Sequence, residues 1–280
     1  MGKFEGILFL SDFDNTILYT AGALKNGGVC PEMNPRNLAA IERFMAEGGY
    51  FGVATGRATD AFRPYASLVP TNVAAVVYNG AGIYNYKKQE YEDTLFLQES
   101  ARVHIQAIVE ANPTVSLEMF HAGTLLHVYR ESNWNKKHTE MTGMGYEVVE
   151  DLSPASVEMP LSKALVLGET ADLIKTAEFI DAQPWRSEYE LVMSSDYLLE
   201  LTAKGATKGD MARRMKEKLG CKMLVCAGDH MNDLRMLRAA DRAFCPSNAV
   251  DGVRAEAYVV CHCQDGAIAE MIEALEKELG

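Results

Sequence analysis

The stretch "SDFDNT", residues 11–16, follows the apolar run Ile7–Leu10 and decides how the rest of the chain is interpreted. Side chains alternate between the two faces of a strand, so Asp12 and Asp14 point the same way at its end. Two carboxylates about 5 Å apart repel by roughly 3 kcal/mol at an effective dielectric constant of about 20. The pair therefore needs a cation, a proton or exposure to water, and a divalent metal is the obvious remedy. A plain turn is the alternative, because Asp and Asn readily bond their own backbone.

The composition indicates a folded globular chain. It has 280 residues, of which 48% are hydrophobic and 24% charged, and this length predicts two domains or one large α/β unit. The net charge of −12 argues against a nucleic-acid partner, because that affinity comes mostly from Lys and Arg. We find no signal-peptide pattern and no apolar run near the roughly 18 residues of a membrane span. These features predict a cytoplasmic protein without a membrane partner, and none of them sets the oligomeric state.

The cysteines are too unevenly spread to form a disulfide framework, so we expect reduced thiols. The run Cys261-His262-Cys263 lacks a second ligand pair and the usual C-x₂₋₄-C spacing of zinc sites, so we do not expect a metal there. The six cysteines stand at positions 30, 221, 226, 245, 261 and 263.

The two ends of the chain share a pattern that its middle lacks. Short apolar runs alternate with helical patterns in residues 1–83 and again in 198–280, which is typical of βαβ units and a parallel sheet. Residues 84–197 are more polar and hairpin-like, with helices expected near 98–111 and 170–181. The sequence therefore predicts an α/β domain interrupted by an inserted α+β domain, an arrangement that needs the ends of the insert to lie close together.

A second acidic group follows a later apolar strand, in "CAGDHMND" at 226–233. Asp229 comes at the end of the strand, and Asp233 falls in the first turn of the next helix. Converging carboxylate oxygens suit Mg²⁺, a hard cation that keeps several waters. Ordinary helix capping is the alternative, because Asp and Asn are common at helix starts.

Two further stretches carry groups that favour anions. In "VATGR", the Thr55 hydroxyl, the Gly56 amide and the following helix start would make an anion cradle. Lys208 in "ATKGD" begins a helix, where its charge is unfavourable unless an anion lies nearby; a plain surface charge is the alternative. Ligands of open α/β sheets bind outside the carboxyl ends of strands, so Asp12, Thr55 and Asp229 are predicted on one rim.

These motifs, in this order, resemble those of the haloacid dehalogenase superfamily of phosphatases: DxDxT, a Thr after a strand, a Lys, and GDxxxD. The segments "YNGA" at 78–81, "SNAVDGV" and "DGAIAEMI" are similar to the Cof-type branch, subfamily IIB. The resemblance implies a Rossmann-like core and an α/β cap of the C2B type inserted into it. The matching stretches are Asp12–Thr16, Thr55–Arg57, Lys208 and Gly228–Asp233.

The resemblance also implies a role for each motif residue. Asp12 would attack phosphorus to form an aspartyl-phosphate, and Asp14 would protonate the leaving oxygen and then activate water. The metal Mg²⁺ would be bound by Asp12, the backbone carbonyl of Asp14 and Asp229, with support from Asp233. The residues implied in phosphate binding are Thr55, Gly56, Lys208 and Asn232.

The chain departs from the family pattern at two motif positions. Asn15 stands where Gly is usual, and Asn tolerates a left-handed backbone better than most residues. His230 replaces the more usual Asn, and we expect its ring to point outward. A protonated ring close to Mg²⁺ would instead repel the ion and give activity an acid limb.

The function predicted first is a Mg²⁺-dependent phosphatase acting on a small phosphorylated metabolite, such as a sugar phosphate or a similar monoester. A phosphomannomutase-like phosphotransferase would share the chemistry through Asp12, and a phosphate-binding module without turnover would share the pocket. Cap residues would recognise the leaving group, although a half-exposed strand produces the same pattern of residues. The cap candidates are Glu118, His121, His127, Tyr129 and Arg130.

Overall fold

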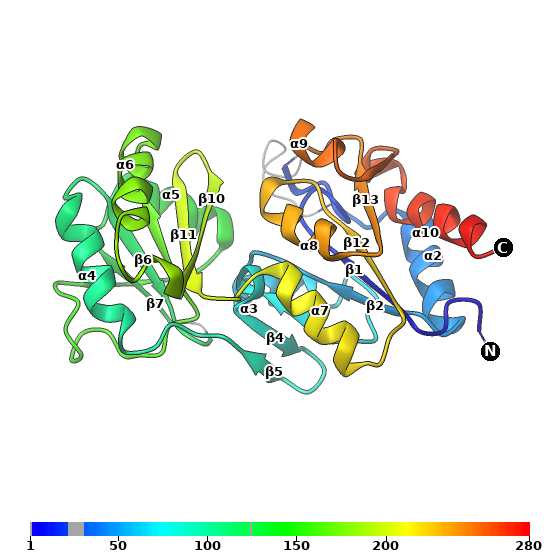
Figure 1. Ribbon diagram of the computed structural model, residues 1–280, viewed down its shortest axis with the longest axis horizontal. Helices are drawn as coiled ribbons and strands as arrows, with labels where there is room; N and C mark the ends of the chain where they lie inside the picture. Colours follow the sequence, from blue (N-terminus) through cyan, green and yellow to red (C-terminus); the bar gives the residue numbers. More distant parts are fainter. Residues whose placement is uncertain (1, 22–30, 124) are drawn as a thin grey trace. The chain divides into compact units, whose positions relative to one another are not determined.

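The computed structural model describes residues 2–21, 31–123 and 125–280. The chain divides into two compact units, each assembled from separated segments (Figure 1). The first unit comprises Met1–Gly56, Arg63–Glu92 and Thr207–Gly280, and the second comprises Arg57–Phe62 and Asp93–Ala206.

The first unit contains the predicted parallel sheet and a second, three-stranded sheet. The strands of this unit are β1 (Ile7–Ser11), β2 (Tyr50–Val53), β3 (Ala75–Val77), β4 (Gly82–Asn85), β5 (Glu90–Thr94), β12 (Met223–Ala227), β13 (Arg242–Pro246) and β14 (Tyr258–Val260). Its helices are α2 (Pro35–Ala46), α7 (Lys208–Lys218), α8 (Leu234–Ala239), α9 (Asp251–Arg254) and α10 (Ala267–Glu278). Its short 3₁₀ turns are η1 (Arg63–Tyr65), η2 (Tyr78–Gly80), η4 (Met231–Asp233) and η5 (Cys263–Asp265).

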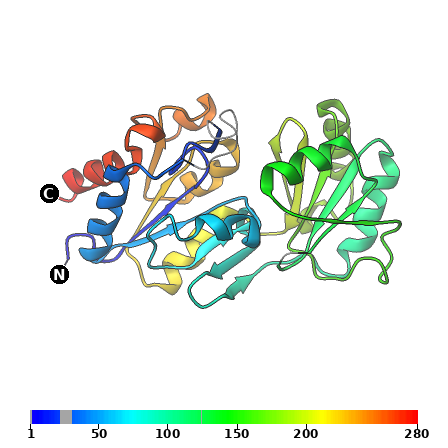
Figure 2. The ribbon, with the colours of Figure 1, turned by 180° about the vertical axis from the view of Figure 1, so that it is seen from behind.

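The main sheet has five parallel strands in the order β14-β13-β12-β1-β2. All of β1 is buried, as expected for a parallel strand covered on both faces. Helices α2 and α10 lie together on one face, and α7 and α8 lie on the other (Figures 1 and 2). The Phe44 ring of α2 packs on Phe9 of β1 with ring centroids 6.1 Å apart. The predicted α/β core is therefore confirmed.

Local sequence signals set the ends of α2. Asn34 caps its start by accepting a hydrogen bond from the Arg36 amide, and Pro35 occupies the first turn, where its missing N–H costs nothing. The helix ends before Gly48, whose φ of +94° suits glycine at a helix C-terminus.

The described residues of the second unit form six strands, three longer helices and one short helix. Its strands are β6 (Ser116–Phe120), β7 (Leu126–Tyr129), β8 (Glu147–Val149), β9 (Lys163–Leu167), β10 (Tyr189–Ser195) and β11 (Leu198–Ala203). Its helices are α3 (Thr59–Phe62), α4 (Ala101–Ala111), α5 (Asn133–Thr142) and α6 (Thr170–Asp181), with a 3₁₀ turn η3 (Arg186–Glu188).

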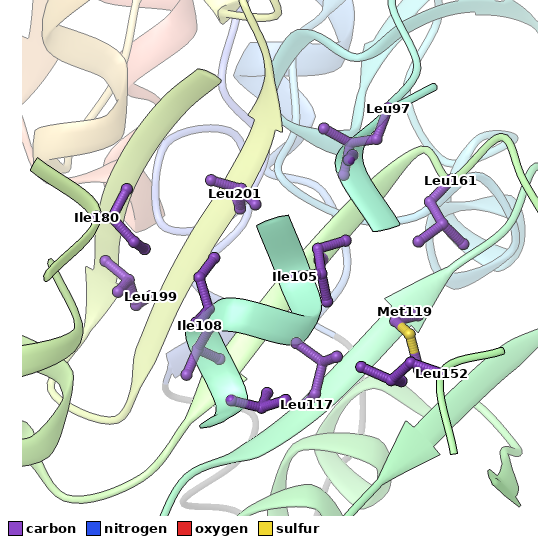
Figure 3. Packing of buried hydrophobic residues seen from close by; sticks show 14 of the residues in the cluster. Leu97, Ile105, Ile108, Leu117, Met119, Leu152, Leu161, Ile180, Leu199 and Leu201 are labelled. Carbon is purple, nitrogen blue, oxygen red and sulfur yellow. The ribbon is translucent and has the colours of Figure 1, made fainter. Parts of the chain in front are cut away.

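The sheet of the second unit is mixed, in the order β10-β11-β9-β6-β7-β8. All its pairs are antiparallel except β7 with β8. Residues of α4 and α6 pack on it to form an apolar core (Figure 3). Labelled members of this core are Leu97, Ile105, Ile108, Leu117, Met119, Leu152, Leu161, Ile180, Leu199 and Leu201. The α+β character expected for the middle of the chain is present here.

The boundaries of the two units differ from those expected at 83/84 and 197/198, and backbone pairing explains both differences. Strand β3 pairs with β4, and β5 continues the same sheet, so the first unit runs on to Glu92. Strand β11 pairs with β10 and β9, so the second unit keeps the chain until Ala206. Apolar texture alone could not show which strands share hydrogen bonds.

Two further observations bear on the chemical environment. Five cysteines carry free thiols, whereas Cys30 lies outside the described residues. Within the described chain, no helix has the length and apolar content needed to cross a membrane.

Helices α7 and α8 touch at a glycine. A Cβ added at Gly209 would lie 2.5 Å from the backbone oxygen of Arg235, and backbone atoms cannot move aside as a flexible side chain can. This close approach brings the start of α7, which begins at Lys208, against the segment that carries Asp233.

We expect Gly209→Ala to lower the free energy of unfolding by about 1–3 kcal/mol, the range for overpacking, despite the better helix propensity of Ala. Urea denaturation measures it. The control is Gly145→Ala, where an added Cβ meets nothing within 4 Å. Equal stability of the two variants would show that the α7–α8 contact tolerates the extra carbon.

Candidate active site

The carboxyl ends of three neighbouring strands bring the predicted motifs to one rim. Strand β1 lies between β12 and β2, and the ladder continues one step past each strand. The Asp12 amide donates to Ala227 O (2.8 Å), and the Ala54 amide donates to Ser11 O (2.9 Å). Asp12, Thr55 and Asp229 therefore follow adjacent strands at the same edge, as the sequence predicted.

Three carboxylates converge at this edge. Asp12, Asp229 and Asp233 each offer an oxygen, and these oxygens lie within 4.8 Å of one another. All three residues are buried. This oxygen-only donor set is the kind that Mg²⁺ prefers, so the residues present fit the metal that the family resemblance implies.

A buried lysine lies among these carboxylates. The ammonium nitrogen of Lys208 is 2.5 Å from Asp12 Oδ1 and 2.7 Å from Asp233 Oδ1, and the Lys208 side chain has no exposed surface. Lys208 opens α7, where Thr207 caps the helix by accepting from the Asp210 amide. The anionic partner expected for a lysine at a helix start is therefore a pair of carboxylates.

Burial and mutual repulsion shift the ionisation of the cluster. Burial, reinforced by the other carboxylates, raises the pKa of Asp12 well above its ordinary value against the opposing effect of Lys208. Burial and the charge of Asp233 raise the pKa of Asp229 to about 7. Burial also opposes the charge of Lys208, but Asp12 and Asp233 outweigh it and raise its pKa. Lys208 is thus a permanent cation in a site with surplus negative charge.

Asp233 also holds the loop that carries Asp229. Its Oδ2 accepts hydrogen bonds from the amides of Asp229 (3.0 Å) and His230 (3.1 Å). A Cβ at Gly228 would lie 2.4 Å from Cβ of Asp233, so only glycine lets the loop pack this closely. The position of the His230 ring stays a prediction.

The turn after β1 is left-handed at Asn15, with φ of 58°, so the expectation for this departure from Gly is confirmed. Its side-chain oxygen accepts from the Ala21 amide (3.0 Å), and its backbone oxygen accepts from Asn248 Nδ2 (2.7 Å). The neighbouring Asp14 is half-buried, and its Oδ1 accepts from the Thr20 hydroxyl at 2.7 Å. The side chain of Asp14 lies outside the three-carboxylate cluster.

The remaining predicted phosphate-binding residues meet at a residue that the sequence did not single out. Asn232 Nδ2 donates to Asn79 Oδ1 at 3.1 Å. A Cβ at Gly56 would lie 2.9 Å from the same oxygen, and the Asn79 amide donates to Thr55 O at 3.1 Å. Thr55, Gly56 and Asn232 therefore share Asn79 as a neighbour.

Sequence reasoning gave no individual role to three residues of the site: Thr16, which counted only as part of the DxDxT match, Asn79 and Asn248. The Thr16 hydroxyl donates to Asp229 Oδ1 at 3.3 Å. Asn79 and Asn248 lie in "YNGA" and "SNAVDGV", which were used only as signs of family. The Asn-Gly pair at 79–80 was a usable signal, because it marks a turn with a left-handed backbone.

The cap candidates all have partners inside the second unit, which favours the structural alternative for them. Glu118 accepts from Asn135 (3.2 Å) and pairs with His138 (2.7 Å). The rings of His121 and His127 are hydrogen-bonded at 3.1 Å. Arg130 donates to Val109 O at 2.6 Å, and its guanidinium lies 5.0 Å from the centre of the Tyr129 ring.

Comparison with known proteins shows the family and similar folds. A model of the haloacid dehalogenase-like hydrolases matches residues 9–272. The pyridoxal phosphate phosphatase YbhA of Escherichia coli is 23% identical, over 81% of this chain and 85% of its own. A haloacid dehalogenase-like hydrolase from Bacteroides thetaiotaomicron superposes with a TM-score of 0.79 at 21% identity, covering 97% and 99% of the two chains. The subclass IIB sugar phosphatase BT4131 superposes with a TM-score of 0.76 at 18% identity, covering 96% and 98%.

The chain therefore belongs to the haloacid dehalogenase-like hydrolase family. The resemblance drawn from the four motifs is confirmed, and so is the fold class that it implied.

We expect Lys208→Met to lower the free energy of unfolding by about 3–5 kcal/mol without added metal, because it leaves buried carboxylates unpaired. The raised pKa of Lys208 means that its contribution is fully present below its unfolded pKa of about 10.4 and is lost only as pH rises through the folded pKa. At pH 7 the Lys208 ammonium is fully charged in the wild type, so urea denaturation at that pH measures the loss of free energy of unfolding in the variant.

The matched control is Lys216→Met on the same helix. Lys216 pairs with Asp241 at 2.7 Å on a partly exposed face, where such a pair contributes about 1 kcal/mol or less. Equal losses for the two variants would contradict the importance of the buried ammonium.

Proposed function

We propose that the chain is a Mg²⁺-dependent phosphatase that hydrolyses a small phosphorylated metabolite through an aspartyl-phosphate. The observation that carries the proposal is the buried Lys208 ammonium 2.5 Å from Asp12, beside three converging carboxylates. A nucleophilic carboxylate, a fixed cation and an oxygen donor set for a metal are the parts that phosphoryl transfer requires.

In the proposed reaction, an oxygen of Asp12 attacks phosphorus, and the bond from phosphorus to the leaving oxygen breaks. Asp14 gives its proton to that oxygen and then takes a proton from water, which attacks the aspartyl-phosphate and releases inorganic phosphate. Splitting the displacement into two steps lets Asp12 return to its starting state.

Charge is neutralised by groups already in place. Lys208, Thr55 and Asn232 would hold the non-bridging phosphate oxygens, and the Gly56 amide would add a donor at the start of the next segment. Mg²⁺, held by Asp12, the Asp14 carbonyl and Asp229 with support from Asp233, would supply further positive charge at the phosphoryl group.

The relatives support the substrate class. Two similar proteins are named as a pyridoxal phosphate phosphatase and a subclass IIB sugar phosphatase. We therefore propose a sugar phosphate or a similar phosphorylated metabolite. The cytoplasmic location and the lack of nucleic-acid and membrane partners stay predictions. That residues 84–197 form a C2B cap also stays a proposal. The compact unit that contains most of them comprises Arg57–Phe62 and Asp93–Ala206.

We expect Asp12→Asn to lower hydrolysis of p-nitrophenyl phosphate by about a thousandfold or more, because the amide cannot act as the nucleophile. Phosphate release in the presence of Mg²⁺ measures it. The control is Asp241→Asn, which precedes β13 at the opposite, amino-terminal edge of the sheet and should leave the rate unchanged. Hydrolysis by Asp12→Asn at the wild-type rate would exclude Asp12 as the nucleophile.

We expect Mg²⁺ to bind more tightly as pH rises from 6 to 8. The pKa of Asp229 is raised to about 7, so below that pH a proton must leave before the carboxylate can bind the ion, and affinity falls by up to about tenfold per pH unit. Calorimetric titration at pH 6, 7 and 8 measures the trend. In Asp229→Asn the pH dependence should weaken but not vanish, because the pKa of Asp12 is raised as well, and a wild-type affinity that does not change with pH would contradict the assignment.

A further inference from the structure

The turn that follows β3 has an unusual backbone. Tyr78, Asn79 and Gly80 have φ angles of 52°, 55° and 112°, three consecutive residues in the left-handed region. This region is costly for residues with a Cβ, and such strain persists only where the surroundings hold it. Tyr78 is completely buried and Asn79 is 8% exposed, so the turn is enclosed by its neighbours.

Packing against α7 explains why the third residue of the turn is a glycine. A Cβ at Gly80 would lie 2.2 Å from the carbonyl carbon of Thr207, which caps the helix that Lys208 begins. The backbone of the turn therefore lies directly against the helix start that delivers the lysine to the carboxylates.

Contacts of the Asn79 side chain explain why the second residue of the turn is an asparagine. Its amide group packs so close to Gly56 that an added Cβ there would lie 2.9 Å from Oδ1 and 3.0 Å from Nδ2. The same Oδ1 accepts the hydrogen bond from Asn232 Nδ2. One short turn thus contacts every segment that carries a predicted phosphate-binding residue.

We infer that Asn79 is a positioning residue for phosphate recognition and acts through Asn232. An Asn side chain has two N–H donors and can rotate. The bond to Asn79 holds one of these donors and fixes the plane of the amide, so the second N–H of Asn232 is available to a phosphate oxygen. This inference rests on the proposed function, because it takes phosphate to be the ligand of the site.

The test uses inorganic phosphate as the probe and calorimetry as the measurement, in the presence of Mg²⁺. The variants are Asn79→Gly, Asn232→Ala and the double variant. Glycine adopts a positive φ without steric cost, so Asn79→Gly removes the side chain and keeps the turn. We expect each single variant to raise the Kd for phosphate about five- to tenfold, the effect of losing about one hydrogen bond. The double variant should be no weaker than Asn232→Ala alone.

Gln89→Gly is the matched control. Gln89 is an exposed residue of the β4–β5 hairpin with φ of 57°. Its replacement by glycine relieves the same kind of backbone strain in a segment that carries no predicted phosphate-binding residue. Its Kd for phosphate should equal that of the wild type. An unchanged Kd in Asn79→Gly, or additive effects in the double variant, would overturn the positioning role.

A second variant covers the case in which Asn79→Gly fails to fold. Asn79→Asp keeps an oxygen for Asn232 and tolerates the left-handed backbone, but it adds a negative charge beside the bound anion. Asn79 is 8% exposed, so salt screens the added charge little, and the Kd for phosphate at one ionic strength is the readout. Phosphate binding should weaken in Asn79→Asp, and a wild-type Kd would overturn the inference.

The outcomes separate this inference from the proposed function. Coupling between Asn79 and Asn232 in a chain that binds phosphate but hydrolyses no monoester would sustain the positioning role and reject the phosphatase. Hydrolysis of a monoester without that coupling would sustain the phosphatase and reject the positioning role. A wild-type chain that binds no phosphate would overturn the inference.

Discussion

The ammonium of Lys208 between Asp12 and Asp233 is the interaction on which the site depends. Burying a carboxylate without a counter-charge is costly, and this chain buries three of them within 4.8 Å. One lysine cannot neutralise three acids, which is why burial and repulsion raise the pKa of Asp229 to about 7. The three carboxylates form an oxygen donor set of the kind that a divalent cation prefers, and the buried lysine beside them carries the opposite charge.

The surrounding backbone is built to hold these charges close together. Neighbouring parallel strands end at one edge, so residues more than 200 positions apart in the chain, such as Asp12 and Asp229, become adjacent. Gly209 lets α7 approach α8, and Gly228 lets the Asp229 loop fold over Asp233. Left-handed residues at Asn15 and Asn79 turn the chain sharply at the same edge, where backbone strain often accompanies function.

Much of this arrangement could be predicted from the sequence, because its signals are local. Apolar runs of four or five residues ending in Asp, Thr or Gly identified the strands and the edge where they end. Strand alternation also predicted one face for Asp12 and Asp14, but β1 ends at Ser11, and the side chain of Asp14 lies outside the three-carboxylate cluster. The domain boundaries could not be predicted in the same way. Whether β4 or β11 belongs to one sheet or another depends on which strands share hydrogen bonds, and the composition of a strand does not reveal its partner.

By itself, the sequence determined the fold class, the sheet edge at which the motif residues gather and the identity of the charged groups, since strand periodicity and motif order follow from residue types. Only the tertiary structure decided how those groups pair. It paired Lys208 with Asp12 and Asp233, gave the cap candidates hydrogen-bond or cation–π partners within the second unit, and brought Asn79 to Asn232. The physical reason is that hydrogen bonds and ion pairs depend on distances of about 3 Å, and packing sets such distances between segments far apart in the chain.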